Sequence, residues 1–317
     1  MGDYMNKFKI HFLNTIWSDA IILEKNNHFA FVDTGSAFYY PMIQKHLEQY
    51  NIKDIDFIFL THFHNDHYGN VKNIINDYNV KTLYLKHYHG LDGTTSSGYA
   101  SNEEYIENEF KNYYNILEAA KNNNVNIIFI DDLEHTELDS MTIQFEDVLI
   151  DAYDISNRLY EMYSNPESEF YQQKRFNENF NCAGLFIKYN NQSIFLGADV
   201  TCSSTDIEIL KELSIKMLNR IYSKYNINKI NLYKSCHHGG GGTNTKKLCD
   251  YLKADYVVIT NTARWLDTYD TYDNLEQANE YVRICVTDFH KYIFTIDEEL
   301  NCESISEKSL FLTLGKN

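Results

Sequence analysis

Three histidines and one aspartate within six residues constrain this chain more than any other feature. The residues His62, His64, Asp66 and His67 form the pattern H-x-H-x-D-H directly after Ile55–Leu60, an apolar run typical of a buried strand. If the strand continues, His62 and His64 project to one side and both imidazoles can reach one metal ion. Asp66 and His67 begin a helix and can therefore serve a second ion. The alternative, an exposed polar loop, is disfavoured by this density of ligand side chains at a strand end.

Two further strand ends carry residues of the same kind. Asp199 follows the predicted strand Ser193–Leu196, and its carboxylate is predicted to bridge both ions. His237 and His238 follow the predicted strand Ile230–Tyr233 and precede four glycines, which leave room for a substrate. We expect His238 to be the ligand, and His237 to support it or to contact the substrate.

The order of predicted elements indicates an α/β fold. Hairpins and strand–helix units occur in both halves of the chain, which favours a four-layer α/β/β/α sandwich. Two hairpins are predicted, with turns at 25–28 and 190–192. The predicted strands are 8–13, 20–23, 29–32, 55–60, 81–85, 125–130, 141–149, 185–189, 193–196, 230–233 and 256–260. The predicted helices are 41–50, 66–78, 102–121, 204–225 and 245–252.

A single domain of 317 residues can fill such a sandwich. We therefore expect one domain over 1–317, with a polar loop or insertion at about 151–181. The apolar fraction of 44% excludes a disordered chain. No apolar run is long enough for a membrane span, and no signal peptide is recognisable. The six cysteines form no C-x-x-C pair, which fits a reduced, cytoplasmic protein; a native leader would make it secreted.

The motifs resemble those of the metallo-β-lactamase superfamily. Besides H-x-H-x-D-H, the resemblance rests on Asp33-Thr34-Gly35, Gly197-Ala198-Asp199 and His237-His238-Gly239. Within the superfamily, the segments 18–24, 28–35 and 195–199 are most similar to the catalytic module of teichoic-acid phosphorylcholine esterases and to the hydrolase domain of competence DNA-uptake proteins. Those esterases are secreted and carry choline-binding repeats, and neither feature is recognisable here.

The resemblance implies the α/β/β/α fold, phosphoester hydrolysis and six metal ligands. Those ligands are His62, His64, Asp66, His67, Asp199 and His238. Many members of the superfamily place a further histidine before the Asp199 strand. Here that stretch is Asn179-Phe180-Asn181-Cys182, so we expect one metal to be less fully coordinated.

Two divalent ions about 3.5 to 4 Å apart would hold a bridging hydroxide in line with phosphorus, without a protein nucleophile. Imidazole and carboxylate ligands favour zinc and also permit manganese or iron. We expect Asp66 to orient the hydroxide and His237 to stabilise charge on the phosphoryl oxygens. Trp17, Trp265 and Asn181 are predicted to contact substrate, and the two indoles could enclose a quaternary ammonium such as choline.

The expected substrate is a small or cell-envelope phosphoester, such as a phosphorylcholine ester. A nuclease of the competence-protein type is the alternative enzyme, although a net charge of −17 disfavours nucleic acid as a partner. A noncatalytic metal-binding scaffold, a β-lactamase and a thioesterase are further alternatives on this fold. The sequence does not specify an oligomeric state.

Overall fold

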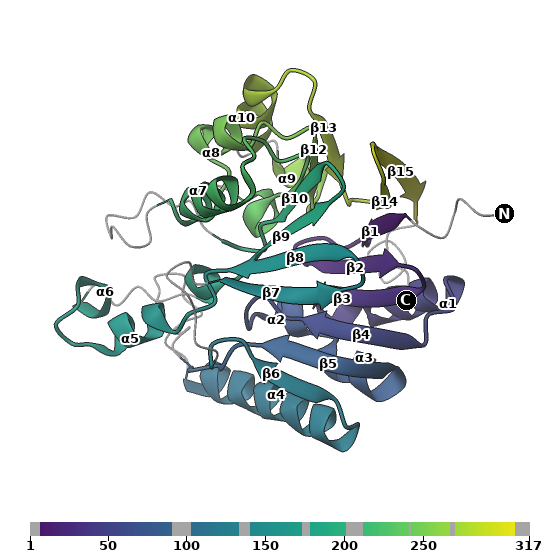
Figure 1. The fold of residues 1–317 in the computed structure, drawn as a ribbon. Helices are drawn as coiled ribbons and strands as arrows, with labels where there is room; N and C mark the ends of the chain where they lie inside the picture. The colour runs from purple at the N-terminus through teal and green to yellow at the C-terminus, as the bar shows by residue number, and fades with distance from the viewer. Residues whose placement is uncertain are drawn as a thin grey trace.

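The fold is that of a computed structural model of the 317-residue chain. The structure describes residues 7–90, 103–132, 140–172, 178–200, 212–240, 242–266 and 270–307. Two sheets form the centre of the molecule (Figure 1).

In these ranges the first sheet has eight strands in the order β15-β14-β1-β2-β3-β4-β5-β6. Strands β3 to β6 run parallel to one another, whereas β15, β14, β1 and β2 pair antiparallel with their neighbours. The strands are β1 (Phe8–Phe12), β2 (Ala20–Lys25), β3 (His28–Thr34), β4 (Asp54–Phe59), β5 (Asn79–Leu85), β6 (Asn126–Phe129), β14 (His290–Ile296) and β15 (Leu300–Ser306).

The second sheet has seven described strands in the order β13-β12-β11-β10-β9-β8-β7, of which β10 to β13 are parallel. These strands are β7 (Ser140–Phe145), β8 (Val148–Tyr153), β9 (Gly184–Tyr189), β10 (Gln192–Leu196), β11 (Leu232–Lys234), β12 (Tyr256–Ile259) and β13 (Arg283–Val286).

Helices cover the outer faces of both sheets. In Figure 1, α4 runs beside β5 and β6, whereas α7, α8 and α10 gather beside β10 to β12. The α-helices are α1 (Tyr40–Gln49), α2 (Asn65–Tyr68), α3 (Val71–Asp77), α4 (Glu103–Asn122), α5 (Arg158–Ser164), α6 (Glu169–Gln172), α7 (Leu213–Tyr225), α8 (Lys246–Leu252), α9 (Ala263–Leu266) and α10 (Thr271–Ala278). Three-residue and four-residue 3₁₀ helices are η1 (Ala37–Tyr39), η2 (Glu178–Asn181) and η3 (Cys236–Gly239).

Alternation along the strands separates the core into three apolar clusters. On β10, Ile194 and Leu196 face the other sheet, whereas Phe195 faces the helices. Strand β3 divides in the same way, with Val32 between the sheets and Phe31 under the helices. Because successive side chains of a strand point to opposite faces, each sheet is buried on both sides. The predicted four-layer α/β/β/α sandwich is confirmed.

Both predicted hairpins are confirmed. In the first, Lys25 pairs with His28 across Asn26 and Asn27, whose φ values of 52° and 62° fit a two-residue turn of the primed type. In the second, Tyr189 pairs with Gln192. Asparagine tolerates the left-handed conformation that these turns require.

The structure corrects several predicted element boundaries. The segment 141–149 is not one strand but parts of β7 and β8, joined by a turn at Glu146, where φ is 52°. The predicted helix 66–78 is two helices, α2 and α3, separated by Gly69 and Asn70. The first residues of the predicted helix 204–225 lie outside the described residues, and α7 begins at Leu213.

The segment 151–181 is more ordered than the predicted loop. Residues 151–153 belong to β8, and α5, α6 and η2 follow. In Figure 1, α5 and α6 lie beyond the ends of the sheet strands, at the left of the view. The organisation of residues 1–317 as one domain stays a prediction. No helix among the described residues is long and apolar enough to cross a bilayer.

Candidate metal centre

The predicted ligands come from the carboxyl ends of three parallel strands. His62 and His64 follow β4, and Asp66 and His67 lie in the first turn of α2, which begins directly after His64. Asp199 follows β10. In the second sheet, β10 lies between β9 and β11. The carboxyl ends of β10 and β11 lie at one edge of the second sheet, and the loop after β4 of the first sheet meets them there.

The structure brings the six predicted ligands into two groups that share Asp199. The first group is Asp66, His67, Asp199 and His238, and the second is His62, His64 and Asp199. Within each group the ligand atoms all lie within 4.8 Å of one another. Such a spacing can accommodate one ion per group.

The two carboxylate oxygens of Asp199 face different groups. Its Oδ1 lies 3.4 Å from His67 Nε2 and 3.5 Å from His238 Nε2. Its Oδ2 lies 3.8 Å from His62 Nε2, and His62 Nε2 is in turn 3.0 Å from His64 Nδ1. In the first group, His238 Nε2 is 3.1 Å from Asp66 Oδ2. This arrangement is the one that a bridging carboxylate requires.

Outer hydrogen bonds orient the imidazoles of His67 and His62. His67 Nδ1 lies 2.7 Å from Asp33 Oδ2, and that carboxylate also accepts hydrogen bonds from the Thr61 amide and hydroxyl. Since the Thr61 hydroxyl donates to Asp33, it can accept from His62 Nδ1, which is 3.0 Å away. Protonation of both Nδ1 atoms leaves the Nε2 lone pairs free to face Asp199, as in carboxylate–histidine–metal arrangements.

His238 is held in the same way from the second sheet. Its Nδ1 lies 2.9 Å from Thr260 Oγ1 and 3.2 Å from Asp19 Oδ1. Thr260 directly follows β12, and its hydroxyl donates to Asp19 over 2.7 Å. Thr260 of the second sheet and Asp19, which precedes β2 of the first sheet, therefore fix the orientation of this ligand together.

Carboxylates and imidazoles in this centre shift one another's pKa. Burial by itself would lower the pKa of His67, but the charges of Asp199, Asp33 and Asp66 raise it well above 6.5. Burial would raise the pKa of Asp199, yet the imidazoles of His238 and His67 hold it well below its usual value. For His62, burial and the neighbouring imidazoles of His67 and His64 lower the pKa well below 6.5. The buried carboxylates thus favour positive charge at His67, and a bound cation could supply that charge in place of the imidazole proton.

Two buried atoms at this point have no hydrogen-bond partner among the described residues. They are His67 Nε2 and Asp199 Oδ1, and they face each other. Burying polar atoms unpaired is costly, so a native structure needs a reason for them. A divalent cation between them supplies one, and the imidazole and carboxylate donors fit such an ion.

The backbone of the ligand loops is unusual. Ala198, His237 and His238 have φ values of 43°, 46° and 52°, in the left-handed region that favours glycine. Conformations of this kind cluster at functional sites, where the surrounding structure enforces them. Here the His237 amide donates to the Ala198 carbonyl over 2.8 Å, which ties the two loops together.

His237 and Trp17 lie beside the ligand groups. The His237 side chain is 40% exposed, and its Nε2 is 3.9 Å from Asp199 Oδ2. The Trp17 ring is half-buried and meets the His238 ring edge-on, at a centroid distance of 6.2 Å. Both positions agree with the predicted contact with substrate, which stays a prediction.

The other two predicted substrate residues have different outcomes. Asn181 is buried, and its side-chain and backbone oxygens both accept hydrogen bonds from Lys86 Nζ. Trp265 lies in α9, and its side chain is outside the described part of the structure.

Next to Asn181, Cys182 places its Sγ 3.5 Å from His62 Nδ1, the nitrogen that faces away from Asp199. Cys182 therefore does not replace the histidine that many superfamily members carry here.

Sequence reasoning assigned no role to four residues that support the ligands. They are Asp19, Asp33, Lys234 and Thr260. Asp33 and Asp19 stood within motifs already singled out, Asp33-Thr34-Gly35 and the segment 18–24. The available sequence signal for these two aspartates was a charged residue next to an apolar strand. For Lys234 and Thr260 the sequence offered no signal except their positions at strand ends.

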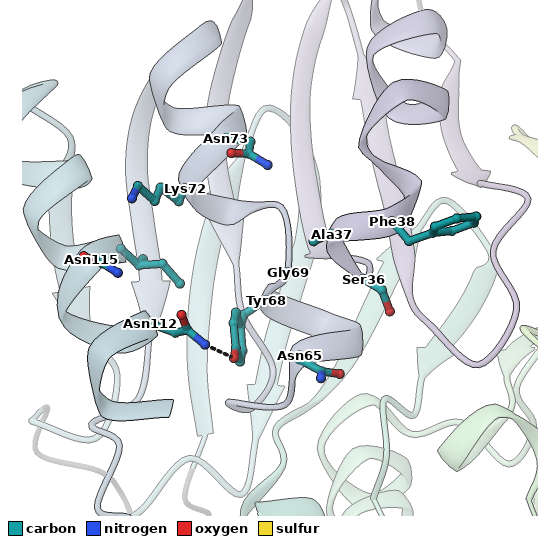
Figure 2. Close-up of a pocket in the computed structure, with 11 residues that line it drawn as sticks. Ser36, Ala37, Phe38, Asn65, Tyr68, Gly69, Lys72, Asn73, Asn112 and Asn115 are labelled. Atoms are coloured by element: carbon teal, nitrogen blue, oxygen red, sulfur yellow. Dashed lines mark hydrogen bonds between the residues drawn. The ribbon is translucent and has the colours of Figure 1, made fainter. Parts of the chain in front are cut away.

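A pocket with a cavity volume of about 450 Å³ lies beside helix α2, which contains two of the predicted ligands (Figure 2). In the close-up, Tyr68 of α2 reaches toward Asn112 of α4, whereas the Asn65 side chain points away from both. The Tyr68 hydroxyl accepts from the Asn112 amide and donates to the buried Glu109 carboxylate. None of the residues that line this pocket is a predicted metal ligand, so it is separate from the candidate metal centre.

Comparison with known proteins agrees with the fold. Residues 18–141 match the family described as "Metallo-beta-lactamase superfamily", a range that contains His62 to His67 but not Asp199 or His238. Together with the two packed sheets and their outer helices, this match shows that the chain has the metallo-β-lactamase fold. Most proteins of that superfamily are metal-dependent hydrolases.

Similar solved structures include YhfI from Bacillus subtilis, with 10% identity, a TM-score of 0.48 and coverage of 95% of this chain and 100% of that one. A diphosphatase from the PhnP family has 11% identity, a TM-score of 0.45 and coverage of 91% and 98%. BJP-1, a subclass B3 metallo-β-lactamase of Bradyrhizobium japonicum, has 14% identity, a TM-score of 0.35 and coverage of 68% and 70%. No curated protein matches the chain significantly in sequence.

Proposed function

We propose that the chain is a dinuclear metal-dependent hydrolase of phosphoesters. The observation that carries the proposal is the Asp199 carboxylate, each oxygen of which faces a different ligand group. A carboxylate shared in this way suits two ions a few ångströms apart, the spacing used for in-line displacement at phosphorus. The imidazole and carboxylate donors favour zinc, with manganese or iron as alternatives.

The second ligand group favours catalysis over a purely structural role. It contains only three described protein ligands, His62, His64 and Asp199. Structural metal sites are usually closed by four protein ligands, whereas catalytic sites leave a position for water or substrate. When bound, the metals would lower the pKa of an attacking water and offset charge on the phosphoryl oxygens.

The chain's own residues would manage the proton and the substrate. The Asp66 side chain is 26% exposed, so its carboxylate can orient a water and accept its proton. The His237 side chain is 40% exposed, and its ring can donate a hydrogen bond to a phosphoryl oxygen. Burial lowers the pKa of His237, so the ring is neutral near pH 7 and donates from a single nitrogen.

The position of Trp17 supports a choline-type ester as the substrate. Its half-buried indole stands next to His238, where a trimethylammonium group could pack on the ring while the phosphoryl group reaches the metals. The net charge of −17 supports a small or cell-envelope ester over nucleic acid. A cytoplasmic location stays a prediction of the sequence.

One assay panel tests the proposal. The chain, loaded with Zn²⁺ or Mn²⁺, is given bis-p-nitrophenyl phosphate, p-nitrophenyl phosphorylcholine, single-stranded DNA and nitrocefin. We expect turnover of the two phosphodiesters and none of nitrocefin. Turnover of nitrocefin or DNA alone would replace the phosphoesterase proposal by a β-lactamase or a nuclease. Metal binding without any turnover would indicate a noncatalytic metal-binding scaffold.

A further inference from the structure

We propose that the buried ion pair between Lys234 and Asp19 is a positioning element for the metal centre rather than a contributor to fold stability. The inference rests on the proposed metal centre and concerns residues that are not ligands. Lys234 is the last residue of β11, and its side chain is 0% exposed. Its ammonium pairs with the carboxylate of Asp19, which is also buried.

Lys234 fixes the loop that carries Asp199. Its ammonium donates to the Ala198 carbonyl over 3.1 Å, and its backbone carbonyl accepts from the Gly197 amide, also over 3.1 Å. A Cβ at Gly197 would lie 3.0 Å from that carbonyl and 2.6 Å from Cys236 Sγ. The loop can therefore approach β11 this closely only with glycine at 197. Lys234 then holds the two residues before Asp199, Gly197 and Ala198, by one hydrogen bond each.

Asp19 extends the same connection to two further ligands. Its Oδ1 lies 3.2 Å from His238 Nδ1, on the far side of the imidazole from Asp199. Its backbone amide donates to the Asp66 carbonyl over 3.1 Å. One ion pair thus connects three of the four ligands of the first group, Asp66, Asp199 and His238, which come from three separate loops.

The chemistry of a buried pair supports a positioning role. Desolvation of both charges consumes much of the Coulombic gain, so such a pair adds little net stability compared with neutral side chains of similar size. The pair instead fixes geometry. An ammonium that bonds to a carboxylate and to a carbonyl sets the distance between the loops that carry these groups. Outer groups of this kind typically change metal affinity by about 10- to 100-fold.

The test removes both charges together in Lys234→Met/Asp19→Asn, which leaves no lone buried charge. Its control is Lys25→Met, because Lys25 is 1% exposed and bonds to Tyr189 and Asp147, neither of which is a predicted ligand. Three properties are measured for each full-length protein. They are the melting temperature without metal, the Zn²⁺ affinity by competition with a chelator, and the visible spectrum of the Co²⁺ form.

We expect the double variant to melt near the wild-type temperature and to bind Zn²⁺ about 10- to 100-fold more weakly, with altered Co²⁺ bands. The control should bind Zn²⁺ within about twofold of wild type. Wild-type affinity and spectrum in the double variant would overturn the inference, and so would an equal loss of affinity in the control. If the double variant does not fold, Lys234→Gln/Asp19→Asn replaces it under the same criteria, since it also leaves no lone buried charge. A wild-type chain that binds no metal would refute the proposed function itself, which is a distinguishable result.

Discussion

At the scale of single residues, the centre depends on which ring nitrogen of each histidine faces Asp199. Asp33 accepts a hydrogen bond from His67 Nδ1, and Thr61 accepts one from His62 Nδ1. Both Nε2 atoms therefore face Asp199. Asp199 is the one residue that belongs to both ligand groups. The function of the centre should therefore be most sensitive at this position.

We predict that Asp199→Ala abolishes phosphodiester hydrolysis and reduces bound metal at both positions, because solvent cannot replace a carboxylate shared by two ions. The fold should persist, since two neighbouring apolar clusters surround the loop. Turnover and metal content measure the effect, and circular dichroism checks the fold. Asp199→Asn is the matched variant: it keeps the size and one oxygen ligand and should retain more metal. Turnover at the wild-type rate in Asp199→Ala would remove this residue from the site.

Trp17→Ala should weaken the reaction with a choline ester about two- to thirtyfold, because a trimethylammonium over an indole face is worth roughly 0.5 to 2 kcal/mol. A neutral aryl phosphodiester should be hardly affected. The values of kcat/KM for the two substrates decide the matter. Equal losses on both would mean that Trp17 supports the His238 loop instead. Trp265→Ala is tested in parallel, since the same role is predicted for it.

At the scale of elements, helix α1 is joined to the first sheet by a buried chain of polar groups. His11 on β1 lies 2.9 Å from Glu24 Oε2 on β2 and 3.1 Å from His46 Nε2 on α1. Lys291 on β14 reaches His46 Nδ1 over 3.4 Å. If His11 Nε2 donates to Glu24, its Nδ1 can accept from His46, and Lys291 can donate to the remaining nitrogen of His46. Both rings are therefore neutral in the folded protein.

This pair predicts a pH dependence of stability. Burial first, and then unfavourable electrostatic interaction with Lys291 and with any proton on His11, lower the pKa of His46 to about 2. Burial also lowers the pKa of His11, against the opposing effect of Glu24. An unfolded histidine takes up a proton below about pH 6.5, whereas folded His46 does not. Stability from this group is thus fully present above about pH 6.5 and is lost progressively as the pH falls toward 2.

The free energy of unfolding should fall by up to about 1.4 kcal/mol per pH unit for His46 below about pH 6. Urea titrations of metal-free protein between pH 7 and 4.5 measure this slope. His46→Leu should flatten it, while His290→Asn, outside the pair, should not. Identical slopes for wild type and His46→Leu would contradict the assignment.

The loops after β4 and β10 also predict unequal metal positions. The first group has four protein ligands, whereas the group of His62, His64 and Asp199 has three among the described residues. Two binding events with different affinities should therefore appear in a calorimetric Zn²⁺ titration. His64→Ala should remove the weaker event and leave the tighter one. Two equal affinities in the wild type would argue that a further ligand completes the second group.

At the scale of the whole molecule, the centre lies where the two sheets and their loops meet. His67 is held by Asp33 of β3, and His238 by Asp19 and by Thr260 after β12. Metal that binds the folded chain but not the unfolded one should therefore stabilise the entire sandwich. At a free metal concentration of a hundred times Kd, the free energy of unfolding rises by about 2.7 kcal/mol. Treatment with EDTA should lower the melting temperature by several degrees, and added Zn²⁺ should restore it. A melting temperature unaffected by EDTA would contradict a centre that spans both sheets.

The sequence predicted the layers, and it indicated the cluster His62 to His67, because both leave local signals. The apolar run Ile55–Leu60, the two asparagine hairpins and the spacing of His62 to His67 are all contained in short windows. The strands β13, β14 and β15 were not predicted. Of these, β14 pairs with β1 from the other end of the chain, and no short window of sequence signals such a pairing. The supporting roles of Asp19 and Lys234 were missed for the same reason, because 215 residues separate the partners of that ion pair (234 − 19).

The central claim is that hydrolysis of a phosphodiester requires two ions, one on each side of Asp199. The most direct test is the rate of bis-p-nitrophenyl phosphate hydrolysis by metal-free protein, as Zn²⁺ or Mn²⁺ is added in measured equivalents. We predict that the rate rises steeply after the first equivalent and levels off at about two ions per chain. A rate that reaches its maximum at one equivalent, or no hydrolysis at any metal loading, would contradict the account.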